Sequence, residues 1–263
     1  MIIKTEAIVL KSMRYRDTSK IVTLYSRRFG KIKGIAKGAR DVKNKFGAAL
    51  EPMTVASVVL YKKEHRDLQL ISQCDIVHRF KRINTDMDRM AVALSVLEIV
   101  YQVTHDEEEN QPLYSLIVHT LEAIDRVEKN VENLFYAFEI RLASLFGYAI
   151  SFDKCLKCRN SIRFGLSTGS FLFDIGKGGL WCPECVRTHE RGDFMSGSKV
   201  LISAQTAKIL ERLSQVQLDS VHTLDDSKAV GNEVDEVLRL YLRYHLEGIK
   251  RLKSRDVFQK MSV

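Results

Sequence analysis

The chain has 263 residues, of which 45% are hydrophobic and 28% charged, as in a globular protein of two or three domains. No apolar run reaches 18 residues and the start lacks the basic and apolar regions of a signal peptide, so we expect neither a transmembrane helix nor secretion. The formal net charge of +8 comes from residues 1–80, which contain 17 Lys and Arg but only 7 Asp and Glu. This concentration of positive charge favours a polyanionic partner over a merely solvated basic surface.

Residues 1–80 have the pattern of short strands separated by turns. The expected strands are rich in β-branched and aromatic residues, and they span 3–10, 20–26, 30–38, 54–61 and 68–77. Five short strands in one segment favour a small closed barrel, and an OB-fold is the obvious candidate. Cys74 lies in the last strand, where we expect it to be a half-buried small hydrophobe.

Lysines recur at every second position in the third strand, so that Lys31 and Lys33 share one face and Lys37 continues it. We interpret this face and the loop after it as the main phosphate contact, made by Lys31, Lys33, Lys37, Arg40, Lys43 and Lys45. Arg14 and Arg16, on the loop after the first strand, are second-rank candidates. Aromatic residues that could either stack on bases or belong to the core are Tyr15, Tyr25, Phe29, Phe46 and Tyr61.

From about residue 84 the apolar residues recur with the period of a helix. Residues 85–88 have the form of a capping box, and Pro112 is expected as the first residue of the next helix. The acidic run 106–109 between these helices is interpreted as a solvated loop rather than a cation site. Further helices are expected at about 131–146, 203–216 and 229–252.

Two Cys-x-x-Cys pairs provide the most specific motif of the chain. Cys155 and Cys158 form the first pair, and Cys182 and Cys185 form the second after a glycine-rich, β-prone spacer. Four thiolates suit tetrahedral Zn²⁺ and leave no position for a substrate water, so we predict one structural zinc ion in a ribbon-like module. Redox dithiols, disulfides and replacement of one ligand by His189 are the less favoured alternatives.

No motif of an enzyme is present: the sequence lacks a phosphate loop with its lysine, a metalloprotease helix and a nucleophile elbow. We therefore predict a protein that is not an enzyme. A metal-dependent nuclease using the carboxylates of Asp86, Asp88, Asp106 and Glu107 is a remote alternative. The more serious alternative is an RNA-binding or transcription factor built from an OB-fold and a zinc ribbon.

The chain closely resembles the bacterial RecO family over essentially its whole length. The most specific stretches are 15–26, 29–31, 35–40 and Leu50-Glu51-Pro52, followed by the four-cysteine unit after a helical segment. Asp17 stands where many relatives have Glu. The resemblance implies an α+β protein with an N-terminal OB-fold and a mainly α-helical domain that contains an inserted zinc module. The corresponding segments here would be 1–80 for the OB-fold, 81–150 and 191–263 for the helical domain, and 151–190 for the module.

The resemblance also implies a recombination mediator in DNA repair. Family members bind single- and double-stranded DNA, anneal complementary strands and work with RecR to load RecA onto strands coated by the single-stranded-DNA-binding protein. A cytoplasmic, nucleoid-associated location follows, and unoxidised thiols arranged for metal fit a reducing compartment. The acidic tail of the single-stranded-DNA-binding protein would bind in an apolar groove with a basic rim, which we expect at Arg239, Tyr241 and Arg243.

Overall fold

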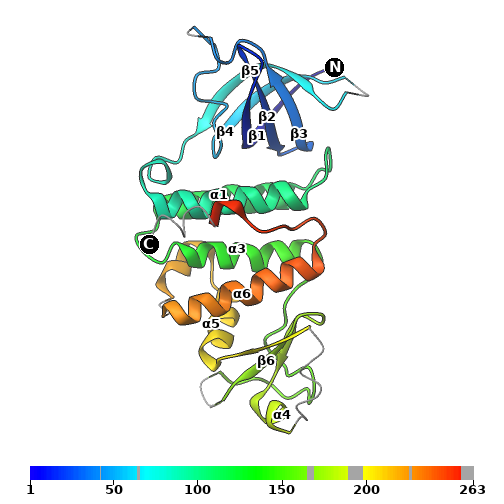
Figure 1. Ribbon diagram of the computed structural model, residues 1–263, viewed down its shortest axis with the longest axis vertical. Helices are drawn as coiled ribbons and strands as arrows, with labels where there is room; N and C mark the ends of the chain where they lie inside the picture. Colours follow the sequence, from blue (N-terminus) through cyan, green and yellow to red (C-terminus); the bar gives the residue numbers. More distant parts are fainter. Residues whose placement is uncertain (42, 64–65, 165–168, 189–197, 225–226, 256–263) are drawn as a thin grey trace. The chain divides into compact units, whose positions relative to one another are not determined.

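The computed structural model describes the chain except for residues 42, 64–65, 165–168, 189–197, 225–226 and 256–263. The chain divides into two compact units. Unit 1 consists of residues 1–126 and the C-terminal segment that starts at 251, and unit 2 consists of residues 127–250. Unit 1 contains a β-barrel and helices, and unit 2 contains helices and a small sheet (Figure 1). This composition confirms the expected α+β class.

Unit 1 begins with a closed barrel whose strand order is β1-β2-β3-β5-β4. Its strands are β1 (Ile2–Tyr15), β2 (Ser19–Ser26), β3 (Gly30–Ala36), β4 (Val55–Tyr61) and β5 (Gln69–His78). All neighbours pair antiparallel except β3 and β5, which share a short parallel register around Ile35 and Leu70. This is the predicted five-stranded OB-type barrel, and its interior is filled by alternate apolar residues such as Val22, Leu24 and Ile32.

The first strand is longer than the predicted segment 3–10. A register shift between Val9 and Lys11 lets β1 bend while it continues to Tyr15. Arg14 is therefore in a strand and not in the following loop, whereas Arg16 lies in the turn and has a φ angle of 51°. The strand is longer than predicted because residues 11–15, most of them polar, still pair with β2 after the apolar alternation ends.

Two helices follow the barrel in unit 1, namely α1 (Met87–Val103) and α2 (Gln111–Arg126). The side chain of Asp86 caps α1 by accepting from the backbone N–H of Arg89 at 3.0 Å, so the predicted cap at Thr85 is wrong by one residue. Thr85 instead belongs to the short 3-10 helix η1 (Ile83–Thr85). Pro112 is the second residue of α2, after Gln111.

The C-terminal segment returns to α1. The carboxylate of Glu98 accepts from the backbone N–H groups of Lys253 and Ser254 at 3.0 and 2.9 Å, and from the Ser254 hydroxyl at 2.7 Å. These bonds explain why residues so far apart in sequence belong to the same unit.

Unit 2 is built on α3 (Glu132–Leu145), α5 (Ala204–Gln215) and α6 (Lys228–His245), with the short 3-10 helix η3 (Leu218–Thr223). The helix α6 ends at His245, earlier than the predicted 252, and Leu246 closes it with a backbone bond to Leu242. No described helix in either unit is both long enough and apolar enough to cross a membrane.

A small sheet in unit 2 contains β6 (Phe171–Asp174), β7 (Gly179–Trp181) and β8 (Lys199–Ile202), in the order β7-β6-β8. The sequence pattern did not predict β8. Its pairing with β6 ties the cysteine-bearing hairpin to the chain that leads directly into α5.

Candidate metal centre and nucleic-acid interface

The four predicted cysteines converge on one point in unit 2. The sulfur atoms of Cys155, Cys158, Cys182 and Cys185 all lie within 4.8 Å of one another, and those of Cys158 and Cys182 are 3.8 Å apart. A tetrahedron with Zn–S bonds of about 2.3 Å separates its sulfur atoms by about 3.8 Å. The separation is far beyond a disulfide bond of about 2.05 Å. Cluster size and donor type therefore both fit a zinc ion.

Local structure presents the sulfurs from two directions. Cys155 lies in a turn that is closed by the backbone bond from Arg159 N–H to its carbonyl at 2.9 Å. Cys182 directly follows β7 as the N-cap of the short helix α4 (Pro183–Arg187), whose first turn contains Cys185. Leu172 and Trp181 pack against the buried cysteines, so the cluster sits on a small apolar core of its own.

Backbone donors prepare the site for thiolates. Burial opposes ionisation of Cys155, but the backbone N–H groups of Cys158, Cys182 and Lys157 donate to its sulfur and lower its pKa to about 7. The Cys182 N–H lies 3.3 Å from that sulfur. Burial raises the pKa of Cys185, so this thiol depends on a cation to ionise. The suggested substitute ligand, His189, is outside the described residues.

Among the described residues, the four cysteines are the one group of potential ligands gathered closely enough to hold a metal ion. Three of the four carboxylates considered for a nuclease have other contacts. Asp86 caps α1, Asp106 pairs with Lys33, and Glu107 pairs with Lys62. This arrangement gives no support to a metal-dependent nuclease site at these acids.

A first group of basic residues gathers where the β1–β2 turn meets the loop after β3. We call it the open basic surface, because the side chains of all its members are exposed: Arg14, Arg16, Lys37, Arg40, Lys43 and Lys45. The Arg40 guanidinium donates to the carbonyl oxygens of Arg16 and Asp17 at 3.1 and 2.9 Å, which holds loop and turn together. Arg14 and Arg40 line a cleft of about 520 Å³ beside Asn44.

The lysines of β3 are in a different environment. Lys31 and Lys33 share one face, as the alternation predicted, but the prediction of an open face is wrong for Lys31, whose side chain is only 10% exposed. Its ammonium donates to the carbonyl oxygens of Tyr101, at 3.1 Å, and Thr104. Burial lowers the pKa of Lys31. A lysine bound in this way is unsuited to contact phosphates.

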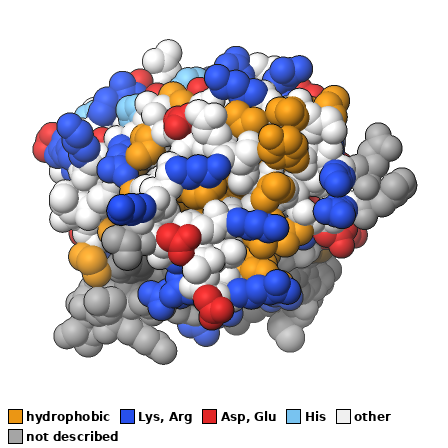
Figure 2. Space-filling model, turned by 90° about the horizontal axis from the view of Figure 1, so that it is seen from above, with side chains coloured by type: hydrophobic (Ala, Val, Ile, Leu, Met, Phe, Trp, Pro, Cys, Tyr) orange, Lys and Arg blue, Asp and Glu red, His pale blue; other side chains and the backbone are white. Residues whose placement is uncertain are grey.

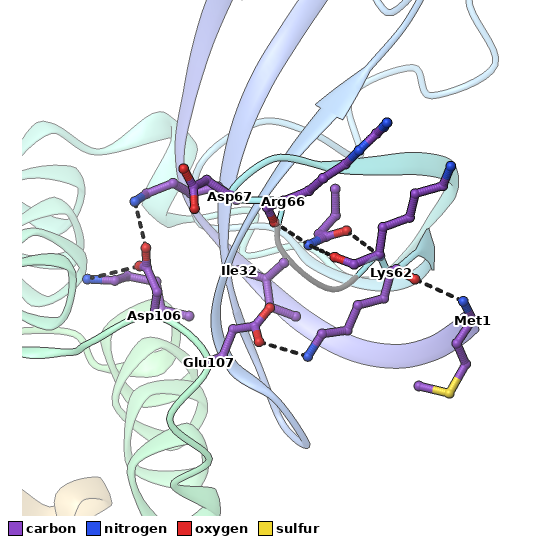
Figure 3. A pocket seen from close by; sticks show the side chains of 11 residues that line it. Met1, Ile32, Lys62, Arg66, Asp67, Asp106 and Glu107 are labelled. Carbon is purple, nitrogen blue, oxygen red and sulfur yellow. Dashed lines mark hydrogen bonds and ion pairs between the residues drawn. The ribbon is translucent and has the colours of Figure 1, made fainter.

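The acidic run Asp106–Glu109, which we call the acidic strap, covers this face. Asp106 Oδ2 lies 2.7 Å from Lys33 Nζ and Glu107 Oε2 lies 2.9 Å from Lys62 Nζ (Figure 3). The hydrogen bond to Asp106 raises the pKa of Lys33. The sequence did not predict that the strap pairs with Lys33 and Lys62, because no local pattern connects the loop before α2 with the barrel.

The aromatic candidates divide between core and surface. Tyr25 and Phe46 are 1% and 3% exposed, so neither ring offers a surface on which bases could stack. Phe46 belongs to the barrel core, whereas Tyr25 alternates with the inward-facing Val22 and Leu24 and is buried on the outer face of β2. Tyr61 is 44% exposed, and the Arg16 guanidinium lies 5.2 Å from the half-buried Tyr15 ring. Phe29 packs partly against the barrel core. Figure 2 shows that Lys and Arg side chains are spread over one face of the molecule with hydrophobic side chains between them.

The predicted partner groove on α6 is wrong in one respect. Tyr241 is 1% exposed, and its hydroxyl donates to the carbonyl oxygen of Tyr148 at 3.1 Å, so it is part of the core of unit 2. Val237 and Leu238 are buried with it. Arg239 and Arg243 are exposed, but the apolar stripe beside them is not available as a groove.

Comparison with known proteins gives a consistent result over the whole chain. Residues 1–80 match the family described as "Recombination protein O N terminal", and residues 84–256 match "Recombination protein O C terminal". The chain is 31% identical to the DNA repair protein RecO of Chloroherpeton thalassium over 262 residues, which cover 99% of both proteins. It is also 31% identical to that of Chlorobium limicola, with 99% of both covered, and to that of Caldanaerobacter subterraneus, with 99% of this chain and 98% of the relative covered.

Proposed function

Since the chain belongs to the RecO family of DNA repair proteins, we propose that it is a recombination mediator that binds single- and double-stranded DNA and anneals complementary strands. In this proposal it works with RecR to load RecA onto strands coated by the single-stranded-DNA-binding protein, whose acidic C-terminal tail it contacts. It acts in the cytoplasm at the nucleoid and catalyses no bond-changing reaction.

The observation that carries the proposal is the open basic surface on the OB-type barrel. Six cations at the end of β1, on the turn after it and on the loop after β3 offer contacts to phosphates without reading base edges. Repair at any sequence requires such sequence-independent contacts. Exposed Tyr61 and the half-buried Tyr15 and Phe29 are the aromatic candidates of the barrel with ring surface that bases could reach. Annealing follows if two strands are held with their charge neutralised and their base edges free.

Lys33 remains a candidate phosphate contact in this proposal, whereas Lys31 does not. The zinc ion has a structural role, held by Cys155, Cys158, Cys182 and Cys185, because four thiolates complete a tetrahedral shell. For the acidic tail we propose contact with the exposed Arg239 and Arg243 without insertion beside Tyr241.

The direct test is a salt-titrated binding measurement with fluorescent single- and double-stranded DNA, together with an assay for annealing of complementary oligonucleotides. We expect binding that weakens linearly with the logarithm of salt concentration, and faster annealing than in protein-free controls. Absence of both activities, or a strong preference for RNA in competition, would contradict the proposal and favour an RNA-binding factor. A pull-down with RecR and with the tail peptide tests the partners separately.

A further inference from the structure

The acidic strap is attached to β3 through its backbone. The N–H of Glu107 donates to the carbonyl oxygen of Lys31 at 2.9 Å, and a parallel bridge pairs Lys31 with Asp106. At Gly30 the strap approaches so closely that a side chain there would collide with the carbonyl oxygen of Glu108. The backbone of the strap therefore follows the start of β3 as a short additional strand would.

The side chains of the strap are held less firmly than its backbone. The side chains of Asp106 and Glu107 are 48% and 47% exposed, and those of their partners Lys33 and Lys62 are 38% and 21% exposed, respectively. Ion pairs in such surroundings contribute about 0–1 kcal/mol and are screened by salt. Another anion can therefore replace Asp106 as the partner of Lys33 with little loss of free energy. The buried Lys31, in contrast, stays bound to the carbonyl oxygens of Tyr101 and Thr104.

Lys33 and Lys62, which pair with the strap, both lie on the wall of one cleft. Lys33, Lys62 and Arg66 line a space of about 820 Å³, and Asp106 and Glu107 are on its wall (Figure 3). A carboxylate and a phosphate both offer anionic oxygens to an ammonium group, so they compete for it. The strap also places four consecutive negative charges, at residues 106–109, beside a barrel that is otherwise basic.

We propose that the acidic strap is an intramolecular competitor of DNA, whose carboxylates occupy Lys33 and Lys62 until phosphates displace them. This inference rests on the proposed DNA-binding function and adds a regulation to it. The backbone of the strap stays in place during the exchange, and only the side chains of Asp106 and Glu107 turn away. The open basic surface binds DNA first, and the cleft contributes additional contacts once its lysines are released.

The test compares DNA binding by the full-length protein with binding by the Asp106→Asn/Glu107→Gln variant. We expect the variant to bind single strands about three- to tenfold more tightly at low salt, because two more lysines become available to phosphates. The log–log salt slope should become steeper by about 1.4, since each added contact contributes about 0.7 on single strands. Replacement of Lys33 by Ala in the same variant should remove about half of both gains.

The matched control is Asp75→Asn/Asp88→Asn, which removes two exposed acids of unit 1 that do not line the cleft and changes the net charge equally. If the strap variant gains no more affinity than this control, the inference is overturned while DNA binding by the parent still supports the proposed function. If neither parent nor variant binds DNA, both fail. Should the double variant not fold, Glu107→Gln alone provides the test, with about half the expected change in slope.

Discussion

The ammonium nitrogen of Lys33 lies 2.7 Å from Oδ2 of Asp106, which joins β3 of the barrel to the connection between α1 and α2. The same carboxylate lies 3.8 Å from the ammonium of Lys31 through its other oxygen. The single Asp106 carboxylate is therefore close to both Lys31 and Lys33, which the alternating sequence pattern of β3 places on one face. This contact divides the predicted phosphate-binding residues into a covered pair on β3 and the open basic surface.

The open basic surface should account for most of the salt dependence of DNA binding. We expect the Arg14→Ala/Lys37→Ala/Lys43→Ala variant to reduce the magnitude of the log–log salt slope on single strands by about 2, since each lost contact removes about 0.7. These three residues are chosen because Arg40 also holds the β1–β2 turn through two carbonyl oxygens. Fluorescence anisotropy over a range of salt concentrations measures the change.

Its control removes three exposed cations of unit 2, in the variant Lys208→Ala/Arg239→Ala/Arg243→Ala. An equal loss of slope in both variants would show that the protein binds DNA through net charge alone and not through the open basic surface.

The cysteine cluster should bind one zinc ion per chain. We expect Cys182→Ser to lose the metal and to loosen the hairpin of β6 and β7, because zinc binding contributes to the folding free energy of such a module. Metal analysis by mass spectrometry and limited proteolysis measure the two effects. Cys74→Ala is the control, since Cys74 is buried in the barrel core and should leave the zinc content unchanged. Zinc-free parent protein with an intact, protease-resistant hairpin would contradict the assignment.

Gly30 should be less tolerant of substitution than Gly47, although both have positive φ angles, of 61° and 52°. Gly47→Ala should lower the free energy of unfolding by about 1 kcal/mol, the cost of the left-handed conformation, because no atom lies near its missing side chain. Gly30→Ala should cost about 2 kcal/mol more, since its methyl group meets the strap at Glu108. Urea denaturation measures the difference, and equal losses would show that the strap is not docked on β3.

The cap of α1 should make the stability of unit 1 depend on pH in the acid range. The backbone N–H of Arg89 holds the pKa of Asp86 below its ordinary value. The stabilisation is therefore complete above the ordinary aspartate pKa of about 4 and is lost as the pH falls through the lower folded value. Asp86→Ala should cost about 1 kcal/mol at pH 7 and less below pH 4.

The comparison variant is Asp86→Asn, which keeps an oxygen acceptor at the cap and should cost less than Asp86→Ala at pH 7. Thermal unfolding at pH 7 and at about pH 3 distinguishes the variants. An equal difference between parent and Asp86→Ala at both pH values would contradict the role assigned to the charge.

Local chemistry was sufficient for several conclusions from the sequence alone. Two Cys-x-x-Cys pairs place thiols on tight turns whatever the surrounding fold, so the metal cluster could be predicted from spacing. The β-branched segments and the alternation of Ile32 between lysines likewise predicted a small barrel and the inner and outer faces of β3. The concentration of positive charge in residues 1–80 indicated which part would meet a polyanion.

Only the tertiary structure decided which of these residues are accessible. Whether Lys31 reaches solvent depends on the carbonyl oxygens of Tyr101 and Thr104, and whether Lys33 is paired depends on Asp106, all far along the chain. The burial of Tyr241 similarly depends on its place in the core of unit 2 and not on the period of α6. A sequence pattern specifies the face on which a side chain lies, whereas long-range packing determines what covers that face.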